Sequence, residues 1–273
     1  ARLGQARRPE QSFGAWRSGQ SFPVASTAAA FAARRARRHV TISLAPSVTA
    51  RACAPCLRPL PATADGDAVA TALRFSGNSN WVAPGHIMVG RYPLMKSDEA
   101  EGRAELRRLL TEANISTFVS LQSEVPSQMD DGQWPARGIK LRSRHFLPYA
   151  RLAQQFAGGR KLHFIHRAWV DLETPGREDL NRLVSDLGER IRAGETVFLH
   201  CAGGRGRSAA LAGCILGELY GLGGEEVLQL VQAGYDTRMR DNSAAPETAA
   251  QRRLVCEFCE TRRSGESLGS GIA

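Results

Sequence analysis

The residues with the clearest chemical character lie at positions 200–208, which read His-Cys-Ala-Gly-Gly-Arg-Gly-Arg-Ser. The three glycines let the backbone curl so that successive N–H groups point inward and form an anion nest of about phosphate size. A helix that begins where this loop ends adds free N–H groups and the positive end of its dipole. The residues expected to bind phosphate in this way are Ala202, Gly203, Gly204, Arg205 and Gly206.

The side chains that flank this loop predict a nucleophile and an anion clamp. The dipoles that attract phosphate should also lower the pKa of the Cys201 thiol and produce the thiolate, which is the nucleophilic form. Arg207 can hold two phosphoryl oxygens through its planar guanidinium group. His200 is expected to order the loop, and Ser208 to donate a hydrogen bond to the departing sulfur. These residues predict a two-step displacement through a cysteinyl-phosphate.

Other interpretations of such a loop are weaker here. A Cys-x5-Arg spacing alone arises by chance, and a glycine-rich turn between a strand and a helix can bind a nucleotide without reacting. The chain has neither the G-K-[S/T] of a nucleotide-binding P-loop nor a G-x-G-x-x-G segment. His, Cys, Gly, Arg and Ser all stand where phosphate chemistry requires them.

The loop resembles the H-C-x5-R-[S/T] loop of the protein tyrosine phosphatase superfamily, in particular its dual-specificity branch. The resemblance runs from about Trp81 to Phe258 and includes Trp-Val-Ala-Pro-Gly at 81–85 and Ser-Ala-Ala-Pro-Glu-Thr-Ala-Ala-Gln at 243–251. Within that branch, the chain is most similar to plant and algal members with a Gly-Gly-Arg-Gly-Arg loop. The resemblance implies a cysteine-dependent phosphatase with no metal and no organic cofactor.

This family expels the leaving group with the help of an Asp on a separate loop, which later acts as a base on water. Asp171 matches that residue, because it follows a predicted strand thirty residues before the cysteine and precedes Pro175, as in the family's Asp-x-x-x-Pro loop. Glu173, Glu178 and Asp179 are the rival candidates. The last two fall in the first turn of a predicted helix, where acids are expected for dipole reasons alone.

Two further residues bear on water and substrate. Gln251 matches a family glutamine that orders water, and its alternative is an ordinary exposed helix residue. Arg205 stands where the commonest protein phosphatase loops have an apolar residue. A second guanidinium group favours extra negative charge, and lipid or inositol phosphatases of the superfamily have Lys or Arg there. The alternative for Arg205 is a salt bridge on the outer face of the loop.

Three functions therefore compete. The leading one is a dual-specificity protein phosphatase that acts on phosphotyrosine and on phosphoserine or phosphothreonine. The second is a phosphatase of a non-protein phosphomonoester, such as phosphatidylglycerophosphate, a phosphoinositide or a phosphoglucan. The third is a binding module that holds a phosphorylated partner without turnover. The third is disfavoured, because nucleophile, clamp, hydroxyl and acid are all present.

From Trp81 onward, short apolar segments alternate with amphipathic ones. Leu180, Leu183, Val184, Leu187 and Ile191 are at helical spacing. Such alternation predicts one α/β domain with a central, mostly parallel sheet flanked by helices, and the phosphate loop at the carboxyl end of its strand. Strands are predicted at 81–92 (a pair with a turn at Pro84-Gly85), 115–121, 140–146, 161–169 and 196–199, and helices at 97–114, 176–192, 208–220, 225–233 and 246–262, with Ser97 as an N-cap.

The chain is predicted to divide into a disordered segment 1–70, a phosphatase domain 71–263 and a flexible tail 264–273. Residues 1–70 contain ten arginines, no lysine and three acids, a net charge of +7 out of +9 for the chain. That composition is typical of an organelle transit peptide, and the alternative is a disordered arm that binds acidic partners. The expected destination is an organelle, a chloroplast in preference to a mitochondrion, and otherwise the cytoplasm.

Composition also excludes several classes of function. The remaining residues carry a charge of only +2, which argues against a nucleic-acid partner. Six cysteines are too few and too irregularly spaced for a disulfide framework, and the two C-x-x-C pairs lack a neighbouring His for a zinc site. No run of eighteen apolar residues predicts a membrane-spanning helix. We expect a monomer whose partner is a phosphorylated protein or another phosphomonoester.

Overall fold

Short apolar runs form a five-stranded sheet of order β1-β2-β7-β3-β6. The computed structural model describes residues 57–61, 66–238 and 242–265, all within the unit Thr41–Ala273. Strands β2, β7, β3 and β6 run parallel, and only β1 is antiparallel to its neighbour, so the predicted sheet is confirmed. The strands are β1 (Ser79–Ala83), β2 (Ile87–Gly90), β3 (Thr117–Gln122), β6 (His163–Trp169) and β7 (Val197–His200).

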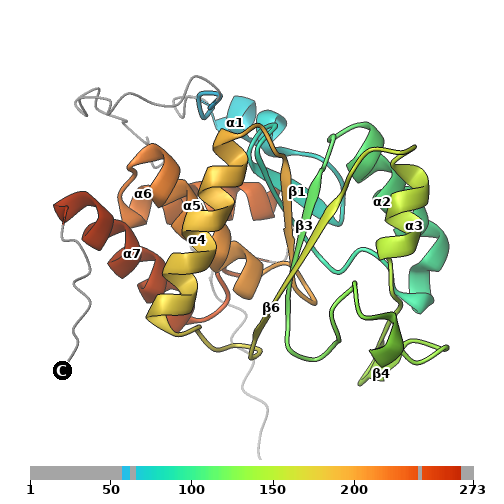
Figure 1. Ribbon diagram of the computed structural model, residues 1–273. Coiled ribbons are helices and arrows are strands. Elements are labelled where there is room, and N and C mark those ends of the chain that lie inside the picture. Colours follow the sequence, from blue (N-terminus) through green and yellow to red (C-terminus); the bar gives the residue numbers. More distant parts are fainter. Residues whose placement is uncertain (1–56, 62–65, 239–241, 266–273) are drawn as a thin grey trace, which may run out of the picture. The chain divides into compact units, whose positions relative to one another are not determined.

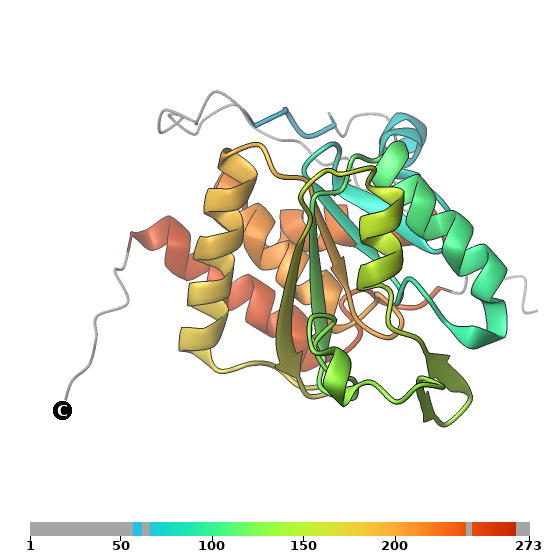
Figure 2. The same ribbon diagram turned by 45° about the vertical axis from the view of Figure 1, so that its right-hand side comes forward.

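Helices cover both faces of this sheet (Figures 1 and 2). Because parallel strands are buried on both faces, β7 is buried at every position. One face packs against α4 (Arg177–Arg192), α5 (Arg207–Tyr220), α6 (Gly224–Asp236) and α7 (Ala249–Ser264). The other face forms a more aromatic core, with Phe118, Tyr149 and Phe198, under α2 (Glu99–Thr111) and α3 (Ala150–Phe156). Because both cores pack against β7, they fix the position of this strand and of the start of the phosphate loop.

The region 123–162 differs most from the prediction. The single strand expected at Lys140 to Phe146 is a hairpin of β4 (Ile139–Leu141) and β5 (Arg144–Phe146), because Arg142 adopts a φ of +54° and reverses the chain. The hairpin is joined to the rest of the molecule by a bridge between Met95 and Phe146. Short 3-10 helices lie at Lys96–Asp98 and Asp131–Gln133, and Ser97 belongs to the first of them rather than capping α2.

Helix α1 (Gly66–Leu73) occupies the end of the segment 1–70, so ordered structure begins earlier than composition indicated. Leu57 and Leu60 also pack against the core, and Arg58 N–H donates to His86 Nε2 at 2.8 Å. The predicted transit segment up to residue 56, its C-x-x-C pair and residues 266–273 lie outside the described residues. Among the helices of the described ranges, none is long and apolar enough to cross a bilayer.

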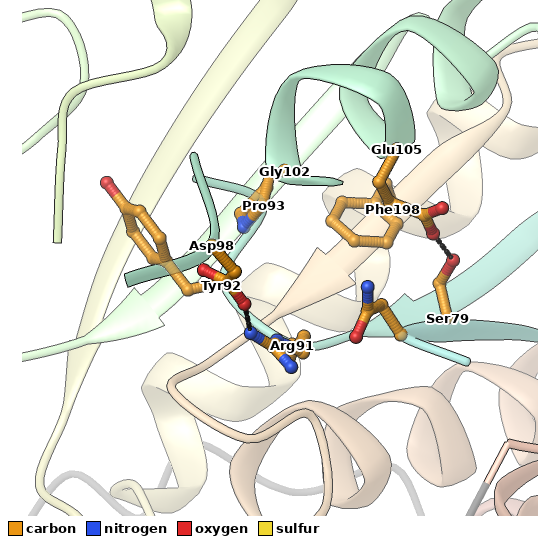
Figure 3. A pocket seen from close by; sticks show the side chains of 9 residues that line it. Ser79, Arg91, Tyr92, Pro93, Asp98, Gly102, Glu105 and Phe198 are labelled. Atoms are coloured by element: carbon orange, nitrogen blue, oxygen red, sulfur yellow. Dashed lines mark hydrogen bonds and ion pairs between the residues drawn. The ribbon is translucent and has the colours of Figure 1, made fainter. Parts of the chain in front are cut away.

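A small cavity lies beside the segment that follows β2, and polar contacts around it hold this segment in place (Figure 3). Arg91 forms an ion pair with Asp98, which closes the loop 91–98 on itself. The buried carboxylate of Glu105 accepts hydrogen bonds from Ser79 Oγ and from Ser76 Oγ. These contacts attach α2 to the edge of the sheet next to the phosphate loop.

Candidate active site

The loop 201–206 connects β7 to α5 at the carboxyl end of the strand, as predicted. Gly204 has a φ of +67°, and a Cβ at this position would lie 2.2 Å from the carbonyl oxygen of Gly90. Only glycine fits there, because both the backbone conformation and the close approach exclude a side chain. Gly206 is the N-cap of α5, so the free N–H groups of that helix face the loop.

The Cys201 sulfur lies within this loop, and its side chain is buried. The Gly204 N–H donates to Sγ at 3.2 Å, and the Ser208 hydroxyl lies 3.5 Å from Sγ. Burial would raise the pKa of the thiol, but the charge of Arg207 and the hydrogen bonds from Ser208 and Gly204 outweigh it, so the pKa lies below its ordinary value. The geometry therefore favours a thiolate.

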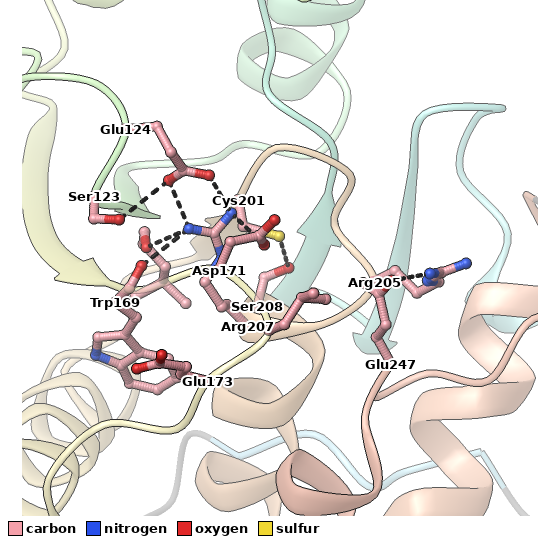
Figure 4. A network of polar contacts seen from close by, with 12 residues as sticks. Ser123, Glu124, Trp169, Asp171, Glu173, Cys201, Arg205, Arg207, Ser208 and Glu247 are labelled. Carbon is pink, nitrogen blue, oxygen red and sulfur yellow. Dashed lines mark hydrogen bonds and ion pairs between the residues drawn. The ribbon is translucent and has the colours of Figure 1, made fainter. Parts of the chain in front are cut away.

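Arg207 is held from several sides although its side chain is only 1% exposed. Nη1 and Nη2 donate to the two carboxylate oxygens of Glu124 at 2.7 and 2.9 Å, and Nη1 also donates to the Trp169 carbonyl at 3.0 Å (Figure 4). Burial acts to raise the pKa of Glu124, but the hydrogen bonds and charge of Arg207 lower it overall. The guanidinium group is thus oriented before any phosphate binds.

Sequence reasoning missed Glu124. This residue belongs to the loop after β3, 83 positions from its partner Arg207. Its one available signal was an acid just beyond the carboxyl end of a buried strand, at the edge where such sheets bind ligands.

Asp171 is brought to the phosphate loop. Its carboxylate forms an ion pair with Arg207 Nη2 at 2.9 Å and lines the same pocket as Cys201 (Figure 4). The side chain is 59% exposed, so it is accessible from the solvent. Among the candidate acids, this one meets the thiol and the clamp together.

The rival acids are placed elsewhere. Glu178 and Asp179 lie in the exposed first turn of α4 and pair with Arg182 at 3.9 and 2.7 Å. Glu173 belongs to the same loop as Asp171, but it does not line the pocket that contains the thiol. The positions of Glu178 and Asp179 agree with the interpretation that these acids favour the positive end of the α4 dipole.

His200 is fully buried directly before the phosphate loop, and its side chain belongs to a polar network. Its Nε2 lies 2.6 Å from the Tyr149 hydroxyl, and the Tyr149 N–H donates to Gln128 Oε1 at 2.8 Å. Burial lowers the pKa of His200 to about 3, so the imidazole is neutral. Gln128 in turn donates to the Tyr92 hydroxyl at 2.8 Å, which extends the network to the loop after β2.

The pocket over Cys201 has a volume of about 430 Å3 and a basic rim. Arg205 forms an ion pair with Glu247, so the salt bridge considered for it exists, yet it also lines the pocket. Arg238 donates to the carbonyl oxygens of Gly204 and Asn78. The remaining lining residues with long side chains are Arg91, Met95, Arg144 and Tyr235.

Gln251 is buried at 1% exposure, so the exposed helix residue considered as its alternative is wrong. Its Nε2 donates to the Glu173 carbonyl at 3.3 Å, and its Oε1 accepts from the Thr248 N–H at 3.2 Å. Within the described ranges, His, Cys, Asp and Glu side chains form no group of three that could hold a metal ion.

A match to a known protein family agrees with this geometry. Residues 76–267 match the family model described as the DSP-PTPase phosphatase domain of Swiss Army Knife proteins. No curated protein matches the chain. Solved structures that resemble it include Tk-PTP in its active form (22% identity, TM-score 0.44, 67% of this chain and 97% of that chain), PTPMT1 in complex with PI(5)P (16%, 0.45, 68% and 98%) and DUSP15 (15%, 0.44, 68% and 90%).

Proposed function

The chain belongs to the DSP-PTPase phosphatase domain family, which is cysteine-dependent, and on that premise we propose that it is a dual-specificity protein phosphatase. Its substrates would be phosphotyrosine and phosphoserine or phosphothreonine in proteins. The observation that carries the proposal is the meeting of three groups in one pocket. A thiol with a lowered pKa and a fixed guanidinium group, both carried by the phosphate loop and the start of α5, meet there an accessible carboxylate from the separate loop after β6. The finer resemblance to plant and algal members is part of the same proposal.

In the first step, the Cys201 thiolate attacks phosphorus while the bond to the leaving oxygen breaks. The amides of the loop and Arg207 hold the equatorial phosphoryl oxygens, whose hydrogen bonds strengthen as charge develops. Asp171 donates its proton to the leaving oxygen, which departs as an alcohol or phenol. The incoming phosphate takes over the position at Arg207 that Asp171 shares in this structure, 2.9 Å from Nη2.

In the second step, water attacks the cysteinyl-phosphate and the sulfur–phosphorus bond breaks. Asp171, now a carboxylate, accepts the proton of the water. The Ser208 hydroxyl, 3.5 Å from Sγ, donates a hydrogen bond to the returning thiolate. His200 acts through structure alone, since its neutral imidazole is buried and bonded to Tyr149.

The basic rim of the pocket supports a second candidate, a phosphatase of a non-protein ester with additional negative charge. Arg144 belongs to β5, is exposed, and reaches to within 3.8 Å of where a Cβ on Gly203 would be. No ion pair engages its charge among the described residues. Arg205 contributes less than its position suggests, because Glu247 neutralises it.

A direct comparison of substrates tests the proposal. The full chain is assayed for phosphate release from phosphotyrosine and phosphoserine peptides, a phosphoinositide, phosphatidylglycerophosphate and a phosphoglucan. We expect the peptides to be preferred and Cys201→Ser to abolish turnover. A hundredfold preference for any non-protein ester would replace the leading candidate with the second, and an inactive wild type would refute both.

A further inference from the structure

Asp171 lies in a turn whose backbone conformation is unfavourable. The Glu173 N–H donates to the Val170 carbonyl at 3.2 Å and closes the turn. Leu172, inside it, has a φ of +67°. A non-glycine residue in this left-handed region persists only where surrounding contacts hold it. The side chains of Val170 and Leu172 are more than half exposed, so those contacts must be made to the backbone of the turn.

The N-terminus of α7 supplies them. Thr248 Oγ1 donates to the Leu172 carbonyl at 3.4 Å, and Gln251 Nε2 donates to the Glu173 carbonyl at 3.3 Å. Thr248 and Gln251 also form a capping box, in which each side chain accepts from the backbone N–H of the other. The amide of Gln251 is therefore oriented, with its oxygen toward Thr248 and its nitrogen toward the turn.

The same amide lies against the phosphate loop. A Cβ placed on Gly206 would lie 3.0 Å from Gln251 Oε1 and 3.2 Å from Nε2. Glu247, the residue before the cap, forms the ion pair with Arg205 of the loop. One buried side chain thus contacts both the loop that holds the nucleophile and the turn that carries the acid.

We propose that Gln251 is a positioning residue, which sets the turn of Asp171 against the phosphate loop so that the acid meets the leaving oxygen. This inference rests on the proposed function. It differs from the water-ordering role that the family resemblance implies, because it is carried by the contacts of the amide to Thr248 and to the Glu173 carbonyl rather than by a contact to water. The step it serves is the first one, in which the leaving group is protonated.

The variant that tests this is Gln251→Glu. It keeps the length of the side chain and can still accept from Thr248, but it cannot donate to the Glu173 carbonyl. Kinetics are compared on 4-nitrophenyl phosphate, whose leaving group departs without a proton, and on a phosphoserine peptide, whose alkoxide must be protonated. We expect kcat/KM to fall about tenfold or more for the peptide and less than about threefold for the aryl ester, because a displaced catalytic group loses much of its effect.

A second pair of variants guards against a folding defect in the first. Thr248→Val removes the cap and the contact to Leu172 and should reproduce the substrate-dependent loss, whereas Thr248→Ser keeps the hydroxyl and should restore wild-type values. Thr261→Ala, whose hydroxyl donates to the Glu257 carbonyl within α7, serves as the control and should leave kcat/KM unchanged for both substrates.

Three results would overturn the inference. Equal losses of kcat/KM for both substrates would indicate general damage to the site. If kcat/KM were unchanged while kcat fell by the same factor for both substrates, and phosphorylated enzyme accumulated, Gln251 would instead order the water of the second step. Wild-type values for Gln251→Glu on both substrates would show that the contact has no role. Failure of the wild type to hydrolyse either ester would instead refute the proposed function.

Discussion

Replacement of Glu124 by Gln tests whether the ion pair with Arg207 stabilises the fold as well as orienting the clamp. Arg207 is almost fully buried, and Glu124 is 18% exposed. The glutamine amide keeps one oxygen acceptor for Arg207 and loses the second charge-assisted hydrogen bond. A hydrogen bond to a charged group contributes about 1.5 to 3 kcal/mol. The guanidinium charge stays buried with less compensation, which destabilises further unless Asp171 takes its place. We expect a loss of about 2 kcal/mol in the free energy of unfolding.

Thermal unfolding measures this loss. For a domain of this size, 2 kcal/mol corresponds to a fall in Tm of about 4 to 8 °C. Glu112→Gln is the matched control, since Glu112 forms a similar pair with Arg108 but is 53% exposed. Exposed pairs contribute about 0.5 kcal/mol or less, so the control should lower Tm by no more than about 1 to 2 °C.

Inorganic phosphate sharpens the test. A bound oxyanion supplies the negative charge that Glu124→Gln removes, and its binding stabilises the folded state by an amount that increases with the logarithm of its affinity. Saturating phosphate should therefore raise the Tm of the variant more than that of the wild type. The reasoning would be refuted if the two Glu variants had the same Tm, or if phosphate shifted Glu124→Gln and wild type equally.

Three further predictions concern protons. Asp171→Asn should lower kcat/KM on a phosphoserine peptide about a hundredfold or more, because the leaving alkoxide then receives no proton from the enzyme, and an unchanged kcat/KM would exclude Asp171 as the acid. At a pH below the ordinary thiol pKa, iodoacetamide should alkylate Cys201 and spare Cys214, because burial raises the pKa of the Cys214 thiol. Mass spectrometry of the treated protein identifies the modified residue. Because the pKa of Cys201 is lower folded than unfolded, its thiolate adds stability above the unfolded pKa that is lost as the pH falls through the folded one. His200, with a folded pKa of about 3, should add stability that is complete above about pH 6.5 and decreases toward pH 3. Denaturant titrations at several pH values should therefore show that the unfolding free energy of His200→Asn changes less between pH 6.5 and pH 3 than that of the wild type. An equal change with pH would contradict the burial of His200 as a neutral ring.

The phosphate loop could be predicted from the sequence because its properties are local. Consecutive glycines, a strand before them and a helix after them determine where the N–H groups point, and Gly204 does adopt the positive φ that this requires. The alternation of elements was predictable for a similar reason, since the apolar spacing of α4 reports its buried face directly. Asp171 was predicted as the acid from its distance to the cysteine and from the proline after it.

Contacts between distant segments could not be predicted in this way. Glu124 and Arg207 are 83 residues apart, and no local pattern of either residue indicates that they meet. The hairpin of β4 and β5 has too few residues for its alternation to differ from that of one strand, and only the reversal at Arg142 decides it.

Residue type and neighbours along the chain were enough to predict Cys201 as the nucleophile, Arg207 as the clamp and the general alternation of strands and helices, although not α1, α3 or the β4–β5 hairpin. Tertiary structure decided which acid reaches the clamp, placing Asp171 2.9 Å from Arg207 and the acids of α4 beside Arg182. It also decided that Gln251 is buried between two loops rather than exposed on a helix. The physical reason is that charge pairing and burial depend on distances in space, which the packing of the sheet and its helices sets.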